Sequence, residues 1–124
     1  MWLFLPDCFV SIVQKPGHDD LCVRARTVAD LATFRHKIAG TDDAAVLDKL
    51  WPIETGTGTD YHCRFYATHA DVATALAATV SGIDYGNFKS QVSAIHGHER
   101  AHSYMGIWSI MMQVQRRALA AVRR

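Results

Sequence analysis

Four stretches of the chain alternate between apolar and polar residues, which is the pattern of strands with one covered face. They form two pairs: residues 9–14 with 21–26, and residues 52–55 with 61–66. The segments within each pair are joined by turn-forming residues, mainly glycine, proline, aspartate and threonine. The pattern therefore predicts two hairpins.

Each hairpin is followed by a segment with the signature of a helix start. Thr27 precedes Asp30 by three residues, and Thr68 precedes Asp71 by the same spacing. In a capping box of this kind, the hydroxyl and the carboxylate bond free amides at the first helical turn. We therefore predict one helix after Thr27 and a second over residues 70–80.

The two hairpin–helix segments are an internal duplication. Residues 20–26 align with 60–66 at an offset of 40, and residues 27–33 align with 68–74 at an offset of 41. We therefore predict an α+β fold in which two ββα repeats form a four-stranded antiparallel sheet with helices on one face, plus a C-terminal helix. In outline this is similar to a ferredoxin-like sandwich.

Outside the repeats, the sequence predicts two further helical segments. The first is a connector with a short helix capped by Thr41, whose apolar contacts are Val46, Leu47, Leu50 and Trp51. The second is a C-terminal segment that is interrupted at Gly97 and carries an apolar stripe of Tyr104, Met105, Trp108, Met111 and Met112. We predict one domain over residues 1–124, made of repeat 1 (about 9–38), the connector (39–51), repeat 2 (about 52–80) and the C-terminal segment (84–124).

Alternation assigns the side chains of the second strand in each hairpin to opposite faces of the sheet. Those expected beneath the helices are Leu21, Val23, Ala25, Tyr61, Cys63 and Phe65. Those expected on the open face are Arg24, Arg26, His62, Arg64 and Tyr66. Arginines beside an aromatic ring can stack bases and contact phosphates, but they are also frequent in protein interfaces. Because the net charge is only +1, we favour a protein interface.

Composition places the chain among globular proteins, since 49% of its 124 residues are hydrophobic and 20% are charged. No apolar run approaches the roughly 18 to 20 residues of a membrane span, and the apolar N-terminus lacks the basic start of a signal peptide. The three cysteines show no C-x-x-C spacing, which argues against a disulfide framework and predicts a reducing, cytoplasmic setting.

Charge is distributed unevenly along the chain. Residues 1–99 carry a net charge of −4, whereas residues 100–124 carry +5 from five arginines and no acidic residue. Such a basic end can attract an anionic partner. Arginines at the end of a helix are also favoured by the helix dipole alone, and this second explanation needs no partner.

The segment His98-Glu99-Arg100-Ala101-His102 matches H-E-x-x-H, the zinc-hydrolase pattern in which two imidazoles on one helical face bind zinc and the glutamate activates water. Its context is incomplete, because no His, Asp or Glu follows His102 to supply a third ligand. The candidates for an upstream ligand are His62, His69, Asp71 and Asp84, whereas His96 lies on a different helical face.

Several motifs together resemble those of a family of small uncharacterised bacterial proteins. They are SIVQKPG at residues 11–17, VRAR at 23–26, IDYGNFK at 83–89, and GHERAH at 97–102 followed by Tyr104 and Trp108. The resemblance covers residues 1–112 and implies kinship, but it implies no activity, cofactor or site residue.

Three functions are compatible with these patterns. We predict first a small cytoplasmic binding module without a cofactor, which contacts a protein partner or a second copy through the open sheet face and the C-terminal helix, including Trp108. The alternative is a minimal zinc hydrolase with His98 and His102 as ligands and Glu99 as general base. The second alternative is single-stranded nucleic-acid binding through Arg24, Arg26, Arg64 and Tyr66. No pattern indicates a membrane partner.

Overall fold

The computed structural model describes residues 1–58 and 60–123. Its contacts divide the chain into two compact units, Met1–Asp84 and Tyr85–Arg124. The boundary coincides with the predicted start of the C-terminal helical segment, while the single-domain organisation stays a prediction. Within the described ranges, no helix combines the length and the apolar character needed to cross a membrane.

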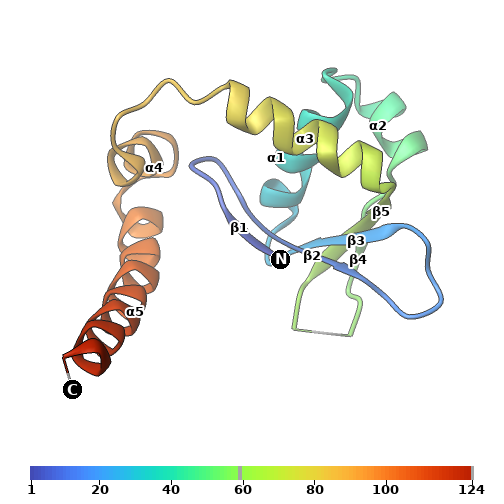
Figure 1. The fold of residues 1–124 in the computed structure, drawn as a ribbon. Helices are drawn as coiled ribbons and strands as arrows, with labels where there is room; N and C mark the ends of the chain where they lie inside the picture. Colours follow the sequence, from blue (N-terminus) through green and yellow to red (C-terminus); the bar gives the residue numbers. More distant parts are fainter. Residues whose placement is uncertain (59, 124) are drawn as a thin grey trace. The chain divides into compact units, whose positions relative to one another are not determined.

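The first unit contains a five-stranded antiparallel sheet with the order β1-β2-β3-β5-β4 (Figure 1). Its strands are β1 Trp2–Phe4, β2 Phe9–Gln14, β3 Leu21–Ala25, β4 Glu54–Thr55 and β5 Cys63–Ala67. The α+β class is thus confirmed, but the prediction of four strands is wrong. The sequence missed β1 because its residues are uniformly apolar and show no alternation. Pairing with β2, where Trp2 lies opposite Ser11, makes this segment a strand.

The corresponding strands of the two repeats lie side by side at the centre of the sheet. Val23 of β3 pairs with Phe65 of β5, and Arg24 pairs with Arg64. β5 begins at Cys63, two residues later than the repeat alignment predicts, and runs to Ala67 directly before the next helix. Each repeat therefore contributes one strand to the centre of the sheet, but the two strands do not begin and end at equivalent positions of the repeats.

In each helix of the first unit, a side chain at the N-terminus accepts a hydrogen bond from a backbone amide of the first turn. At the start of α1 (Val28–Ala39), Thr27 accepts a hydrogen bond from the Asp30 amide as predicted, while the Asp30 carboxylate accepts one from the Phe9 amide. At the start of α3 (His69–Ser81), Thr68 and Asp71 form the predicted capping box. The connector helix α2 (Ala44–Leu50) differs from the prediction, because Asp43 rather than Thr41 caps it.

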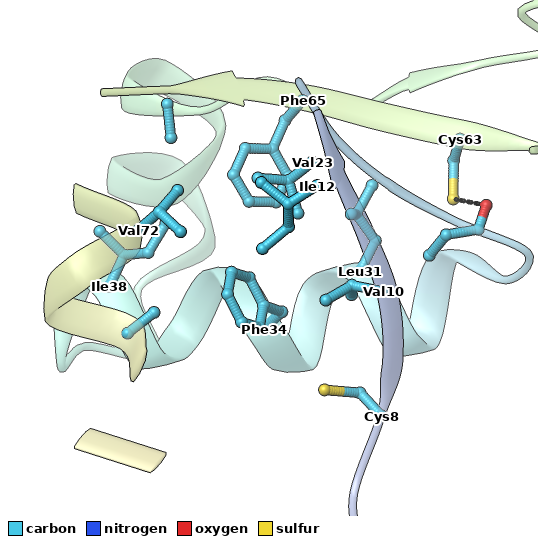
Figure 2. Close-up of a cluster of buried hydrophobic side chains, with 13 residues drawn as sticks. Cys8, Val10, Ile12, Val23, Leu31, Phe34, Ile38, Cys63, Phe65 and Val72 are labelled. Carbon is cyan, nitrogen blue, oxygen red and sulfur yellow. Dashed lines mark hydrogen bonds between the residues drawn. The ribbon is translucent and has the colours of Figure 1, made fainter. Parts of the chain in front are cut away.

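The core lies between the sheet and α1, with α3 packed on α1 (Figures 1 and 2). Of the residues expected beneath the helices, Val23, Ala25, Cys63 and Phe65 are fully buried there, and Leu21 packs against them partly buried. The other buried residues of this core are Cys8, Val10, Ile12, Leu31, Phe34, Ile38, Ala67, Val72 and Ala75. The predicted alternation is therefore correct within both central strands.

The second unit consists of two helices that pack against each other, α4 (Phe88–His96) and α5 (His98–Val122). The Phe88 ring of α4 stacks on the Tyr104 ring of α5, with centroids 5.8 Å apart. Gly97 separates the helices, as predicted, with φ 83° and ψ 179°. A backbone conformation of this kind is essentially restricted to glycine, so this residue allows the chain to turn between the helices.

Candidate functional site

The open sheet face carries two arginines whose partners lie within the chain. Arg24 donates from Nε to the Ser11 hydroxyl at 3.2 Å, and its guanidinium carbon lies 4.5 Å from the centroid of the Tyr61 ring. Arg26 occupies an equivalent position over the same ring, also at 4.5 Å, and donates to the backbone carbonyl of Asp60. Both cations thus hold the segment that precedes β5.

The structure corrects the predicted sheet face of Tyr61. It was expected beneath the helices with Cys63 and Phe65, but its ring faces the guanidinium groups of Arg24 and Arg26. The residue precedes β5, so the strand alternation does not extend to it. Its side chain is nevertheless 4% exposed. Burial alone would have placed Tyr61 in the core, whereas the contacts place it with the arginines.

Arg64 and Tyr66 of β5 also have partners within the first unit. Arg64 donates from Nη2 to the Thr57 carbonyl at 3.3 Å, and its Nε lies 3.7 Å from a carboxylate oxygen of Glu54. The Tyr66 ring stacks on His18, with centroids 4.9 Å apart. The predicted sheet-face residues are therefore brought together, but their contacts connect strands and loops of this chain.

The charge of the first unit opposes nucleic-acid binding. Residues 1–84 contain seven Lys and Arg against eleven Asp and Glu, a net charge of −4. Phosphate binding needs positive charge in excess, because cations must replace the counterions of the backbone. Nucleic-acid binding by Arg24, Arg26, Arg64 and Tyr66 stays a prediction that no contact in this unit supports.

The H-E-x-x-H segment occupies the first turns of α5, where His98, Glu99 and His102 are all exposed. The Nδ1 atom of His98 lies 3.2 Å from the Ser93 hydroxyl. Among residues 1–58 and 60–123, no group of three His, Cys, Asp or Glu side chains is arranged to hold a metal ion. Of the suggested upstream ligands, Asp71 already accepts hydrogen bonds from the Thr68 amide and the Trp51 indole. Zinc binding by this motif stays a prediction from the sequence.

The three cysteines lie inside the first unit, and none forms a disulfide. Burial raises the pKa of the Cys8 thiol above its ordinary range, and the neighbouring Asp7 carboxylate acts in the same direction. Burial likewise raises the pKa of Cys63, whose Sγ lies 3.5 Å from the Ala25 carbonyl oxygen. A nucleophilic or metal-binding cysteine needs a lowered pKa, so the environments of these two thiols favour a packing role.

Within the second unit, the second half of α5 has an apolar surface that no other described residue of this unit covers. Every residue from 113 to 123 is exposed. Large apolar side chains are nevertheless frequent there and in the preceding turn: Trp108, Ile110, Met111, Val114, Leu119 and Val122. Ser109, Gln113 and Arg116 lie on the opposite side of the helix. We call the side that carries Ile107, Met111, Val114 and Ala118 the apolar face of α5.

This face extends further along the helix than the predicted stripe, which ends at Met112 where the arginine-rich end of the chain begins. The helical spacing of Val114, Ala118 and Ala121 continues the stripe and is the signal in the sequence for the longer face. Trp108, Met111, Met112, Val114 and Gln115 line a shallow groove, and the predicted contact residue Trp108 is therefore part of it. Comparisons of the chain with protein-family models, with curated proteins and with solved structures find no match.

Proposed function

We propose that the protein is a small interaction module that binds another protein chain through the apolar face of α5. One observation carries this proposal: the face lies on a helix whose residues 113–122 are all exposed. Met111 at 58% and Val114 at 49% exposure are at its centre. Exposed apolar side chains gathered on one side of a helix are typical of a surface that another protein covers.

The size of this surface supports the proposal. On this face and on both of its flanks, the six exposed large apolar side chains of α5 present together on the order of 600 Å², at the upper end of the largest apolar patch on a typical monomer. Burying that area would contribute roughly 15 kcal/mol before the costs of association. Those costs are about 4 to 15 kcal/mol, so the expected affinity is moderate and depends on fit.

The proposal assigns binding to α5 and not to the open sheet face. The guanidinium groups of Arg24, Arg26 and Arg64 already contact Tyr61, Asp60, Ser11 and Thr57. An external partner would have to replace these contacts, whereas binding to the apolar face of α5 needs no such exchange. We also infer a cytoplasmic setting, which the three free thiols support because such thiols persist under reducing conditions.

Site-specific photocross-linking in the producing cells tests the proposal. A photoreactive amino acid at position 111 samples the apolar face, and the same residue at position 113 samples the polar side of the same helix. We expect a discrete protein adduct from position 111 and none from position 113. If position 111 gives no adduct, or both positions give the same adducts, α5 is not the binding surface.

A further inference from the structure

We infer that the partner on the apolar face of α5 is a second copy of this chain, and that the two α5 helices pack antiparallel. This inference rests on the proposed function and names its partner. The first support is the spacing along the helix. Apolar residues alternate three and four positions apart over three heptads: Tyr104, Ile107, Met111, Val114, Ala118 and Ala121. Such a spacing produces a continuous seam that matches another helix of the same kind.

The sizes of the seam residues favour the antiparallel orientation. The large residues Tyr104 and Ile107 are at the N-terminal end of the seam, and the small residues Ala118 and Ala121 are at its C-terminal end. A parallel pair would place alanine against alanine and leave the helices underpacked at that end. An antiparallel pair places each large residue opposite a small one.

The antiparallel register follows from the centre of the seam, between Met111 and Val114. With the twofold axis there, Met111 packs against Val114 of the second copy and Ile107 packs against its Ala118. Tyr104 then faces Ala121 of the second copy. The Phe88 ring already stacks on Tyr104, so a small residue is the suitable partner at this position. The contact is the same on both copies, as a twofold dimer requires.

The distribution of charge supports the same orientation. Arg116 and Arg117 lie in the last turns of α5 and Arg123 follows its end, so a parallel pair would bring equal charges to the same end. In the antiparallel register, the arginine-rich C-terminal end of each α5 lies beside the N-terminal end of the second copy, which carries Glu99, the only acidic residue after Asp84.

The available area fits a modest dimer. α5 has 25 residues and is therefore about 37 Å long. Of the exposed large apolar side chains, Met111 and Val114 form the seam and Ile110 and Val122 border it, so each copy would bury less than the about 800 Å² that a partner contributes to a standard interface. The two copies together would bury an area at the low end of stable interfaces, so the association should depend on concentration.

Sedimentation equilibrium of the full chain tests the second copy as partner. We expect a dimer whose dissociation constant rises at least about 100-fold in Met111→Glu, because each dimer then buries two carboxylates. Gln113→Glu adds the same charge on the polar side of α5 and should leave the dimer unchanged. Because Met111 is exposed within one chain, its substitution should not affect folding, and circular dichroism checks this.

At a chain concentration of about 100 μM, even a weak dimer should be populated. If the wild-type chain stays monomeric at this concentration, the inference is overturned. The proposed function is tested separately by the adduct from position 111. An adduct with twice the mass of the chain supports both statements. An adduct with a different protein supports the proposed function and overturns the second copy as partner.

Disulfide trapping tests the orientation. Ile107→Cys and Ala118→Cys are prepared as separate chains and then mixed under mild oxidation. The antiparallel register predicts a cross-link between the two variants in the mixture and none in either variant alone, since equal positions lie about 16 Å apart along the axis. A cross-link of Ile107→Cys with itself overturns the antiparallel register.

Discussion

Replacing Tyr61 by leucine tests whether this ring holds the two arginines of the open sheet face. The leucine side chain fills part of the same space and remains apolar, but it has no aromatic face for a cation. The guanidinium carbons of Arg24 and Arg26 both lie 4.5 Å from the ring centroid, so one substitution removes both interactions. The loops that precede β5 then lose the contact that fixes them against β3.

The expected loss follows from the exposure of the three residues. The Arg26 side chain is 54% exposed, so its contact with the ring belongs at the low end of cation–π energies, about 0.5 kcal/mol. Arg24 is half-buried, and its contact should contribute about 1 kcal/mol. Tyr61 is itself 4% exposed, so the poorer packing of leucine adds about 1 kcal/mol. We expect the free energy of unfolding to fall by about 2 to 3 kcal/mol in total.

Urea unfolding of the wild-type chain and the variant measures this loss, with Tyr66→Leu as the control. Tyr66 lies in β5 and stacks on His18, which is exposed, so the same substitution there should cost less than about 1 kcal/mol. Equal losses for the two variants, or a loss below about 1 kcal/mol for Tyr61→Leu, would refute the assignment of Tyr61 as the residue that organises the arginines.

Three further changes test local features of the fold. Thr68→Ala removes the hydroxyl that caps α3 and should lower the free energy of unfolding by about 1 kcal/mol in thermal melts; Thr74→Ala, inside the same helix, should cost less. Gly97→Ala places a side chain at φ 83° and should cost about 1 to 3 kcal/mol in the helical melt of the second unit, whereas Gly106→Ala inside α5 should be stabilising. Burial raises the pKa of Cys8, so the folded state holds this proton more tightly than the unfolded state. The corresponding stability is complete below the ordinary thiol pKa of about 8.5 and is lost as the pH rises above it; urea midpoints between pH 7 and 10 should fall, and less steeply in Cys8→Ala.

The predicted site residues show where sequence reasoning reaches its limit. The sequence placed His98, Glu99 and His102 together on one helix, and they do lie at the start of α5, because helical periodicity is a local property. It also singled out Trp108 as a contact residue, and Trp108 is exposed. A third metal ligand, by contrast, depends on distant parts of the chain that no local pattern specifies.

For the same reason, the partners of the sheet-face arginines could not be predicted from the sequence. Arg26 bonds Asp60, which is 34 residues away along the chain, and this contact exists only because β3 and β5 pair. Alternation correctly separated Arg24 from Val23, but it could not show that Tyr61 precedes the strand and turns toward the arginines.

The sequence by itself determined which segments become strands and helices, since alternation, helical spacing and capping residues act over a few neighbours. It placed β2 and the caps of α1 and α3 correctly. Tertiary structure alone decided that β1 joins the sheet, because that strand depends on hydrogen bonds with β2. It also decided which apolar faces are covered, because burial depends on what packs against a residue and not on the residue itself. For this reason Phe65 and Met111 are both apolar, yet one lies in the core and the other is left for a partner.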